Sequence, residues 1–291
     1  PTLAVFIKYE FWPNLLDALK KKEIPSILVS GIFREEQIFF KCYGGFMRNS
    51  LKAFHHFFVQ DENSKQLLTT IQFENISVVG DTRFDRVSAI LEQDNSLDFI
   101  KEFKDNTYTV VAGSTWEEDE ALFVHYINHI ASEEEKFIIA PHNIKQDSIL
   151  ALQNALHKKA VLFSEKSNKN LKEYQVFIID TIGVLTKIYS AADTAYVGGG
   201  LKTGLHNILE PAIFGVPIVI GNKYDKFKEA LDLVTLKGVV SIENQEEFTT
   251  IFRTLKNDDL YRKSTGEINK NYIQNNVGAT QSIIKWMQQK I

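Results

Sequence analysis

The feature that most restricts the fold is an alternation between short apolar segments and amphipathic helical segments. An apolar run at residues 2–7 is followed by a helical pattern at 12–23 and a second apolar run at 24–31, and similar pairs recur to about residue 242. Strands that alternate with helices form parallel sheets with crossover helices. The sequence therefore predicts an α/β fold with two doubly wound, Rossmann-like parallel-sheet domains that face a cleft.

A charged, helical stretch at residues 87–106 marks the expected connection between the two domains, because it carries no long apolar run. We predict a first domain at 1–94 and a second at 95–291, in which two helices follow the last strand. The chain of 291 residues is long enough for two cores of ordinary size. Because Pro1 leads directly into an apolar strand, we expect the first domain to be incomplete at its N-terminus.

Composition narrows the class of protein. A net charge of −4 argues against a nucleic-acid binder that is held mainly by phosphate contacts. No apolar run is long enough to span a membrane. The single cysteine, Cys42, is expected to be a small buried side chain. His125 and His129 share a helix face, but no third ligand lies near them in the sequence, so no metal site is predicted.

A glycine triplet at residues 198–200 follows the apolar segment "TAYV". Glycines at the end of a strand allow a ligand or another backbone to come close. Asn207 is a good N-cap and Pro211 suits a first turn, so we expect a helix that ends at Gly215 and directs its free amides toward the glycines, as an anion site. Glu210 is expected to accept hydrogen bonds from a ribose. A glycine-rich turn with a capping carboxylate explains these residues equally well.

Two other strand ends carry small or polar residues. Gly113, Ser114 and Thr115 precede a helix with an acidic first turn, and His142 follows the apolar segment "FIIAP". Because the carboxyl ends of parallel strands meet at one edge of a sheet, we expect these residues and the glycine triplet to form one site. Taken singly, Ser114 and Thr115 are explained equally well as helix caps, and His142 as a loop histidine.

Several motifs, in this order, resemble those of GT-B glycosyltransferases that transfer 3-deoxy-D-manno-octulosonic acid (Kdo) in lipopolysaccharide synthesis. They are "YEFWPN" (9–14), "GDTRFD" (80–85), "AGSTWEEDE" (112–120), "APH" (140–142), "DTIGVLTKIYSAADTAYVGGG" (180–200) and "HNILEPAIFGVPIVIG" (206–221). The resemblance covers nearly the whole chain. It implies transfer of Kdo from CMP-Kdo to the lipid A precursor, with inversion and without metal or cofactor, at the cytoplasmic face of the bacterial inner membrane.

The resemblance also implies roles for single residues. In the second domain, the donor site would consist of Ser114, Thr115, His142, Gly198, Gly199, Gly200, Asn207 and Glu210, with Glu210 on the ribose of CMP and the loop amides on its phosphate. In the first domain, Glu10, Asn14 and Arg83 would face the acceptor. Glu10 is the catalytic candidate there, and the general base and a membrane-associating helix are expected before Pro1. Helix capping beside a packed Trp12 is the alternative explanation of Glu10 and Asn14.

The chain departs from the family pattern at three positions. Pro141 stands where an arginine is usual, Trp116 where a histidine is common, and Arg83 where a lysine is usual. Two other functions remain open: a different GT-B enzyme that uses a UDP-sugar, as a transferase or an epimerase, and a non-catalytic module with the same fold.

The aromatic and basic segment at residues 34–58 has two interpretations. Its apolar side chains, among them Phe39 and Phe46, could lie on a bilayer surface beside the basic ones. Alternatively, the segment faces the core of the first domain, which is the interpretation we prefer.

Overall fold

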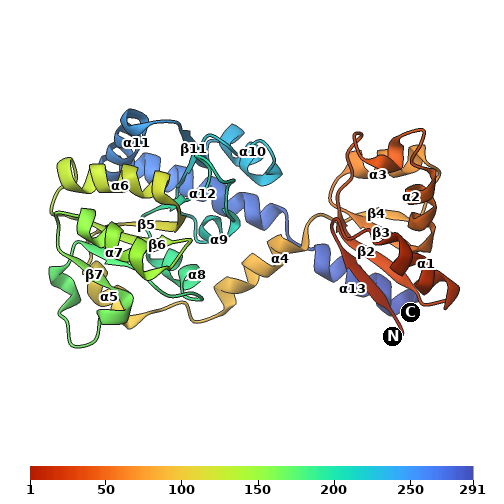
Figure 1. Ribbon diagram of the computed structural model, residues 1–291, viewed down its shortest axis with the longest axis horizontal. Helices are drawn as coiled ribbons and strands as arrows, with labels where there is room; N and C mark the ends of the chain where they lie inside the picture. The colour runs from red at the N-terminus through yellow and green to blue at the C-terminus, as the bar shows by residue number, and fades with distance from the viewer. Residues whose placement is uncertain (291) are drawn as a thin grey trace. The chain divides into compact units, whose positions relative to one another are not determined.

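The computed structural model describes residues 1–290, which form two compact units, each built on a parallel sheet (Figure 1). The first unit combines Pro1–Arg86 with the C-terminal residues from Asn276, and the second unit is Val87–Asn275. The predicted α/β class with two parallel sheets is confirmed. The units differ from the predicted ranges 1–94 and 95–291, because the division falls earlier and the end of the chain returns to the first unit.

Four parallel strands in the order β1-β2-β3-β4 form the sheet of the first unit. They are β1 (Ala4–Ile7), β2 (Ser26–Gly31), β3 (His56–Val59) and β4 (Ile76–Val78). The helices between them are α1 (Pro13–Lys21), α2 (Gly45–Ser50) and α3 (Glu62–Thr70). Asp61 begins α3 as an N-cap, because its carboxylate accepts the amide of Ser64 at 2.7 Å.

The main core of the first unit lies between this sheet and the helices α1 to α3. Phe6, Leu28 and Phe57 of the strands pack there with Leu16 of α1. Within the segment 34–58, Phe39 is buried in the same core, as the core-facing interpretation expects, whereas Phe46 is 72% exposed. Cys42 is exposed, so the expectation of a buried thiol was wrong.

The helix α13 (Ala279–Lys290) covers the other face of the four-stranded sheet (Figure 1). Its Ile283 is 6% exposed and packs in one cluster with Ile27 and Val29 of β2. The carboxylate of Asp85 accepts the amide of Thr280 and its hydroxyl, both at 2.7 Å, at the start of the helix. The expectation of two closing helices was therefore incomplete, because a third helix completes the first unit.

Replacement of Asp85 by alanine is expected to lower the free energy of unfolding of the first unit by about 1–2 kcal/mol, since it removes the acceptor that caps α13. Hydrogen exchange of the amides at 279–290 should accelerate. As a control, Asp17→Ala removes only an exposed ion pair with Lys21 and should change stability by less than about 0.5 kcal/mol. Unaltered exchange in α13 of the Asp85 variant would contradict the assignment.

Seven parallel strands in the order β11-β10-β9-β5-β6-β8-β7 form the sheet of the second unit. They are β5 (Tyr108–Thr115), β6 (Glu135–Pro141), β7 (Ala160–Leu162), β8 (Val176–Ile178), β9 (Thr194–Val197), β10 (Ile218–Gly221) and β11 (Val239–Ile242). The central strands β5 and β9 are buried along most of their length because both faces of the sheet are covered by helices.

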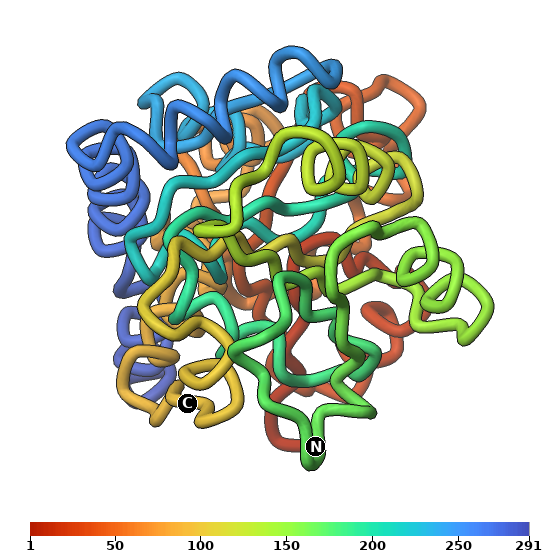
Figure 2. Tube along the Cα trace, turned by 90° about the vertical axis from the view of Figure 1, so that its left-hand side faces the viewer, coloured from red at the N-terminus to blue at the C-terminus, as the bar shows by residue number. Residues whose placement is uncertain are grey.

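One face of this sheet is covered by α6 (Glu117–His129), α7 (Gln146–Ala155) and α11 (Gln245–Asn257). Phe123 of α6 meets Phe248 of α11 edge-on at 4.9 Å, and the two helices lie side by side in both views (Figures 1 and 2). On the other face, Phe103 of α5 (Asp98–Lys104) packs on Phe177 of β8. The side-chain amide of Asn269 in α12 (Asp259–Asn275) donates to the carbonyl of Val216 before β10.

The remaining α-helices are short. They are α4 (Thr82–Ser88), which carries the chain into the second unit, α8 (Leu185–Ile188), α9 (Leu209–Ala212) and α10 (Lys228–Thr235). Within residues 1–290, no helix combines the length and the apolar character needed to cross a membrane.

Candidate functional site

The carboxyl ends of β5 and β9 lie side by side where the second sheet changes its direction of winding. From β5 the strands are added first on the side of β6 and then, from β9 onward, on the other side. Gly113 pairs with Val197, so the segment 113–115 adjoins the glycine triplet at 198–200. The amide of His142, which follows β6, donates to the carbonyl of Thr115 at 2.8 Å. The three predicted strand ends therefore meet at the position where such sheets bind ligands.

The three glycines are needed for different reasons. Gly199 has a φ of +88°, which side chains rarely tolerate. A Cβ on Gly198 would lie 2.3 Å from the carbonyl oxygen of Ser114, and one on Gly200 would lie 2.8 Å from the amide nitrogen of Gly221. The triplet thus lets the ends of β5, β9 and β10 approach one another closely.

Two of the glycine amides are already used by the protein. The amide of Gly198 donates to the carbonyl of Gly113, and that of Gly199 to the carboxylate of Asp119, both at 2.9 Å. A phosphate at these two amides would have to displace an existing acceptor. The resemblance implied that the loop amides bind the phosphate of CMP. Because the amides of Gly198 and Gly199 already have protein acceptors, the phosphate would need other donors at this edge.

Asp119 is a structural anchor of the site that the sequence interpretation did not single out. It is 1% exposed, and its carboxylate accepts from the amides of Trp116 and Gly199 at 2.9 Å and from the hydroxyl of Tyr196 at 2.6 Å. Burial raises the pKa of this carboxyl, and the three donors oppose the rise. The available signal was its place three residues after the N-cap Trp116, from which a carboxylate can reach back to the backbone of the N-cap.

Glu210 accepts hydrogen bonds from two neighbouring side chains. Its Oε2 accepts from the hydroxyl of Thr186 at 2.6 Å, and its Oε1 accepts from the side-chain amide of Asn207 at 3.0 Å. A carboxylate offers about four acceptor positions, so each oxygen can accept one further hydrogen bond. The half-buried position of Glu210 leaves it within reach of a ligand.

The helix expected from Asn207 to Gly215 is much shorter in the structure. It spans Leu209–Ala212, and Asn207 forms a turn before it by accepting the amide of Leu209 at 3.1 Å. With four residues the helix has too few aligned peptides to make a strong anion site at its N-terminus, so that expectation was wrong. Gly215, which was expected to end the helix, lies three residues beyond its last residue and has a φ of +70°.

Ser114 has an unusual backbone for a serine. Its φ of +54° places it in the left-handed region at the carboxyl end of β5. Such a conformation is unfavourable outside glycine and concentrates at functional sites. The neighbouring Thr115 is fully buried and donates its hydroxyl to Glu120 of α6 at 3.0 Å. Ser114 is thus the better candidate for a ligand contact, and Thr115 for support of the loop.

The stability of the second unit should depend on pH through Glu120. Burial raises the pKa of its carboxyl from 4.5 to about 7, and the nearby charges of Asp119 and Glu117 act in the same direction. Between these two values the unfolded chain has lost this proton and the folded chain retains it, so the free energy of unfolding should fall as pH rises. Glu120→Gln should remove this dependence, whereas Glu117→Gln at an exposed position should not. Urea unfolding at pH 5 and pH 7.5 measures the change in the free energy of unfolding between the two pH values. The same change in Glu120→Gln and in the unmodified chain would refute the prediction.

Three aromatic rings are stacked beside the glycine loop. The ring of His142 lies 4.5 Å from those of both Trp116 and His206, measured between centroids. The indole Nε1 of Trp116 donates to Nε2 of His206 at 3.1 Å. The sequence predicted His142 at this site and missed His206, whose only signal was its place beside Asn207 in a recognised motif.

The predicted residues of the first unit lie near the carboxyl edge of its own sheet. Glu10 follows β1 and accepts a hydrogen bond from the indole of Trp12, which is 60% exposed. Neither Glu10 nor Asn14 caps α1, so capping beside a packed Trp12 does not explain them. Asn14 lines a small cavity of about 100 Å³ between α1 and α2.

Arg83 is held in the first unit by a buried carboxylate. Asp81 is 3% exposed, and its Oδ2 lies 2.8 Å from Nε of Arg83 and 3.0 Å from Nζ of Lys8. Burial opposes ionisation of Asp81, but the hydrogen bonds and charge of Arg83 and the charge of Lys8 outweigh it and lower the pKa of the carboxyl. The ion pairs fix two cations at the edge of the first sheet.

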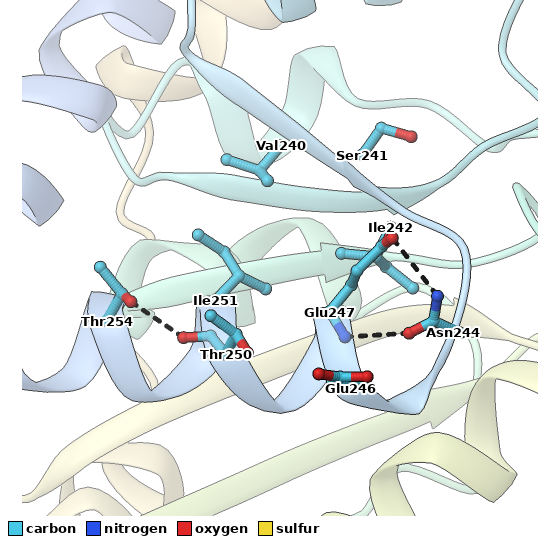
Figure 3. Close-up of a pocket in the computed structure, with 9 residues that line it drawn as sticks. All are labelled: Val240, Ser241, Ile242, Asn244, Glu246, Glu247, Thr250, Ile251 and Thr254. Carbon is cyan, nitrogen blue, oxygen red and sulfur yellow. Dashed lines mark hydrogen bonds between the residues drawn. The ribbon is translucent and has the colours of Figure 1, made fainter.

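Two other cavities, both in the second unit, are not lined by any of the predicted site residues. The one in Figure 3 has a volume of about 490 Å³ and lies between β11 and α11, where Ser241, Asn244 and Glu247 line it. Another, of about 470 Å³, lies between α6 and α7 and is lined by His125 and His129. Among residues 1–290, no group of three or more His, Cys, Asp or Glu side chains is arranged to hold a metal ion.

Two solved structures have a fold similar to that of this chain. The crystal structure of the C-terminal CMP-Kdo binding domain of WaaA from Acinetobacter baumannii is similar over 66% of this chain and 99% of its own, with a TM-score of 0.53 and 21% identity. UDP-GlcNAc 2-epimerase from Neisseria meningitidis is similar over 100% of this chain and 76% of its own, with a TM-score of 0.68 and 14% identity. Both likenesses concern the fold.

Sequence comparison identifies the relatives. Residues 1–86 match the family of 3-deoxy-D-manno-octulosonic-acid transferases (kdotransferase). A bifunctional glycosyltransferase/methyltransferase of Fusobacterium nucleatum is 25% identical over 97% of this chain and 45% of its own length. The 3-deoxy-D-manno-octulosonic acid transferase of Chlamydophila psittaci is 26% identical over 76% of this chain and 52% of its own length, and that of Chlamydia trachomatis serovar A is 26% identical over 98% and 68%.

The chain spans about half the length of the first two of these relatives. Similarity to the transferases nevertheless extends beyond the matched family region and across both units. The predicted resemblance is therefore confirmed: over nearly its whole length the chain is similar in sequence to 3-deoxy-D-manno-octulosonic acid transferases.

Proposed function

We propose that the protein is a glycosyltransferase that moves Kdo from CMP-Kdo to the lipid A precursor and releases CMP. The observation that carries this proposal is the similarity to Kdo transferases over up to 98% of the chain, which includes the strand ends gathered in the second unit. The proposal includes inversion at the anomeric carbon, reaction without a metal ion or other cofactor, and work at the cytoplasmic face of the bacterial inner membrane.

The second unit would bind the nucleotide of the donor. Glu210 has acceptor capacity for two ribose hydroxyls while it keeps its bonds to Thr186 and Asn207. Ser114 offers a hydroxyl at the edge where β5 and β9 adjoin. CMP is a good leaving group, so donors directed at its phosphate stabilise the transition state without further chemistry at that end.

The first unit would bind the acceptor. The fixed cations Lys8 and Arg83 suit the phosphates of a lipid A precursor, because a guanidinium and an ammonium both bind such groups. Glu10 is an exposed carboxylate next to this edge and is the candidate for interaction with an acceptor hydroxyl. The exposed Phe46 on α2 suits contact with a membrane surface, where an apolar ring can enter the interface.

Calorimetry with the chain and three nucleotides tests this proposal. We expect CMP to bind and UMP and UDP to bind at least about 10-fold more weakly, a difference that a few base-specific hydrogen bonds can provide. Preferential binding of UDP would favour the UDP-sugar enzyme, to which the epimerase-like fold points. No binding of any nucleotide would favour a non-catalytic module and would refute the proposal.

A further inference from the structure

The hydrogen bond between Trp116 and His206 determines where the ring proton of His206 resides. The indole Nε1 lies 3.1 Å from Nε2 of His206. An indole N–H can only donate, so Nε2 of His206 must offer a lone pair. In a neutral imidazole the proton then has to be on Nδ1.

His206 is kept neutral near pH 7 by its surroundings. Burial lowers the pKa of its imidazole, and the charge of His142 acts in the same direction, whereas the carboxylate of Asp119 acts against both. Protonation of Nε2 would also place two donors, its own N–H and that of Trp116, against each other. His206 therefore presents a neutral Nδ1–H.

The position of this N–H is set by the glycine loop. The amide of His206 donates to the carbonyl of Gly198 at 3.2 Å, and a Cβ on Gly199 would lie 3.1 Å from Cδ2 of the ring. In the part of the chain that the structure describes, no protein acceptor is hydrogen-bonded to Nδ1. The ring therefore brings an available donor to an edge where the amides of Gly198 and Gly199 are already engaged.

We propose that Trp116 is a positioning residue, which fixes His206 in the Nδ1–H tautomer so that this group donates to the phosphate of the bound nucleotide. The inference rests on the proposed function, since it names the partner of the nucleotide that the second unit would bind. It assigns the indole a task that stacking alone would not require, because a phenyl ring could pack on His142 equally well.

Nitrogen NMR of the imidazoles tests the tautomer without any ligand. In the unmodified chain at pH 7.5 we expect the Nδ1–H form of His206. Trp116→Phe keeps a ring against His142 and removes the donor, so the population should shift toward the Nε2–H form, which is commoner in free histidine. The exposed His157 in another part of the second unit should stay unchanged. An Nε2–H form of His206 in the unmodified chain, a measurement that needs no variant, would overturn the inference.

Binding of CMP and of cytidine tests the contact with phosphate. Trp116→Phe should lower the affinity for CMP by about 3- to 10-fold and leave the affinity for cytidine unchanged, because one charge-assisted hydrogen bond to the phosphate is weakened. An equal loss for both ligands would indicate a structural role and overturn the inference. If the unmodified chain bound no CMP, the proposed function would fail together with the phosphate contact, whereas a wrong tautomer would overturn this inference alone.

Discussion

Replacement of Asp119 by asparagine is expected to lower the free energy of unfolding of the second unit by about 2–4 kcal/mol. Its buried carboxylate accepts three hydrogen bonds, from Trp116, Tyr196 and Gly199. An asparagine amide has one oxygen and turns two donors toward groups that also donate, so at least one buried polar group loses its partner. The glycine loop should loosen as well, since the bond to Gly199 is lost.

Urea unfolding of the chain measures this effect, and the neighbouring acid provides the control. Glu118 pairs with Lys202 at the surface, so Glu118→Gln should cost less than about 1 kcal/mol. Hydrogen exchange at residues 198–204 should accelerate only in the Asp119 variant. If the two variants unfolded at the same urea concentration, Asp119 would not be the anchor described here.

Replacement of Glu210 by alanine is expected to lower the affinity for CMP by about 10- to 100-fold, because two hydrogen bonds from the ribose to a charged carboxylate would be lost. The comparison of CMP with 2′-deoxy-CMP isolates the ribose contact. The unmodified chain should bind CMP more tightly than the deoxy form, and the variant should bind both alike. This arrangement is a double-mutant cycle between one side chain and one hydroxyl.

Thr186→Val serves as the matched control for Glu210. It removes a protein donor to Oε2 but leaves the carboxylate in place, so it should alter the affinity for CMP only slightly. A Glu210→Ala variant that still distinguishes CMP from the deoxy form would show that the ribose is bound by another residue. Calorimetry of the unmodified chain and of Glu210→Ala, each with CMP and with 2′-deoxy-CMP, supplies the measurement.

Local signals in the sequence were sufficient to predict the fold class and the meeting of the strand ends. Alternating strands and helices predict parallel sheets, and parallel strands bring Thr115, His142 and the glycine triplet to one edge. These features follow from rules that depend on neighbouring residues or on the direction of the strands.

The features that the sequence did not reveal depend on contacts between distant residues. Asp119 reaches Gly199 only because β5 and β9 are adjacent, and Trp116 reaches His206 for the same reason. The carboxylate of Asp85 accepts the amide of Thr280 at the start of α13, although nearly two hundred residues separate the two. The length of α9 was overestimated because Asn207 is used in a turn before the helix. The identity of a residue does not show which group, far away in the sequence, its side chain will contact.

A crystal structure of the chain with CMP would test the central claim most directly. We predict that the nucleotide lies at the carboxyl ends of β5, β6 and β9, with its ribose hydroxyls on Glu210 and its phosphate near Ser114 and His206. CMP bound between β11 and α11 instead, or an unoccupied edge at saturating CMP, would contradict the account.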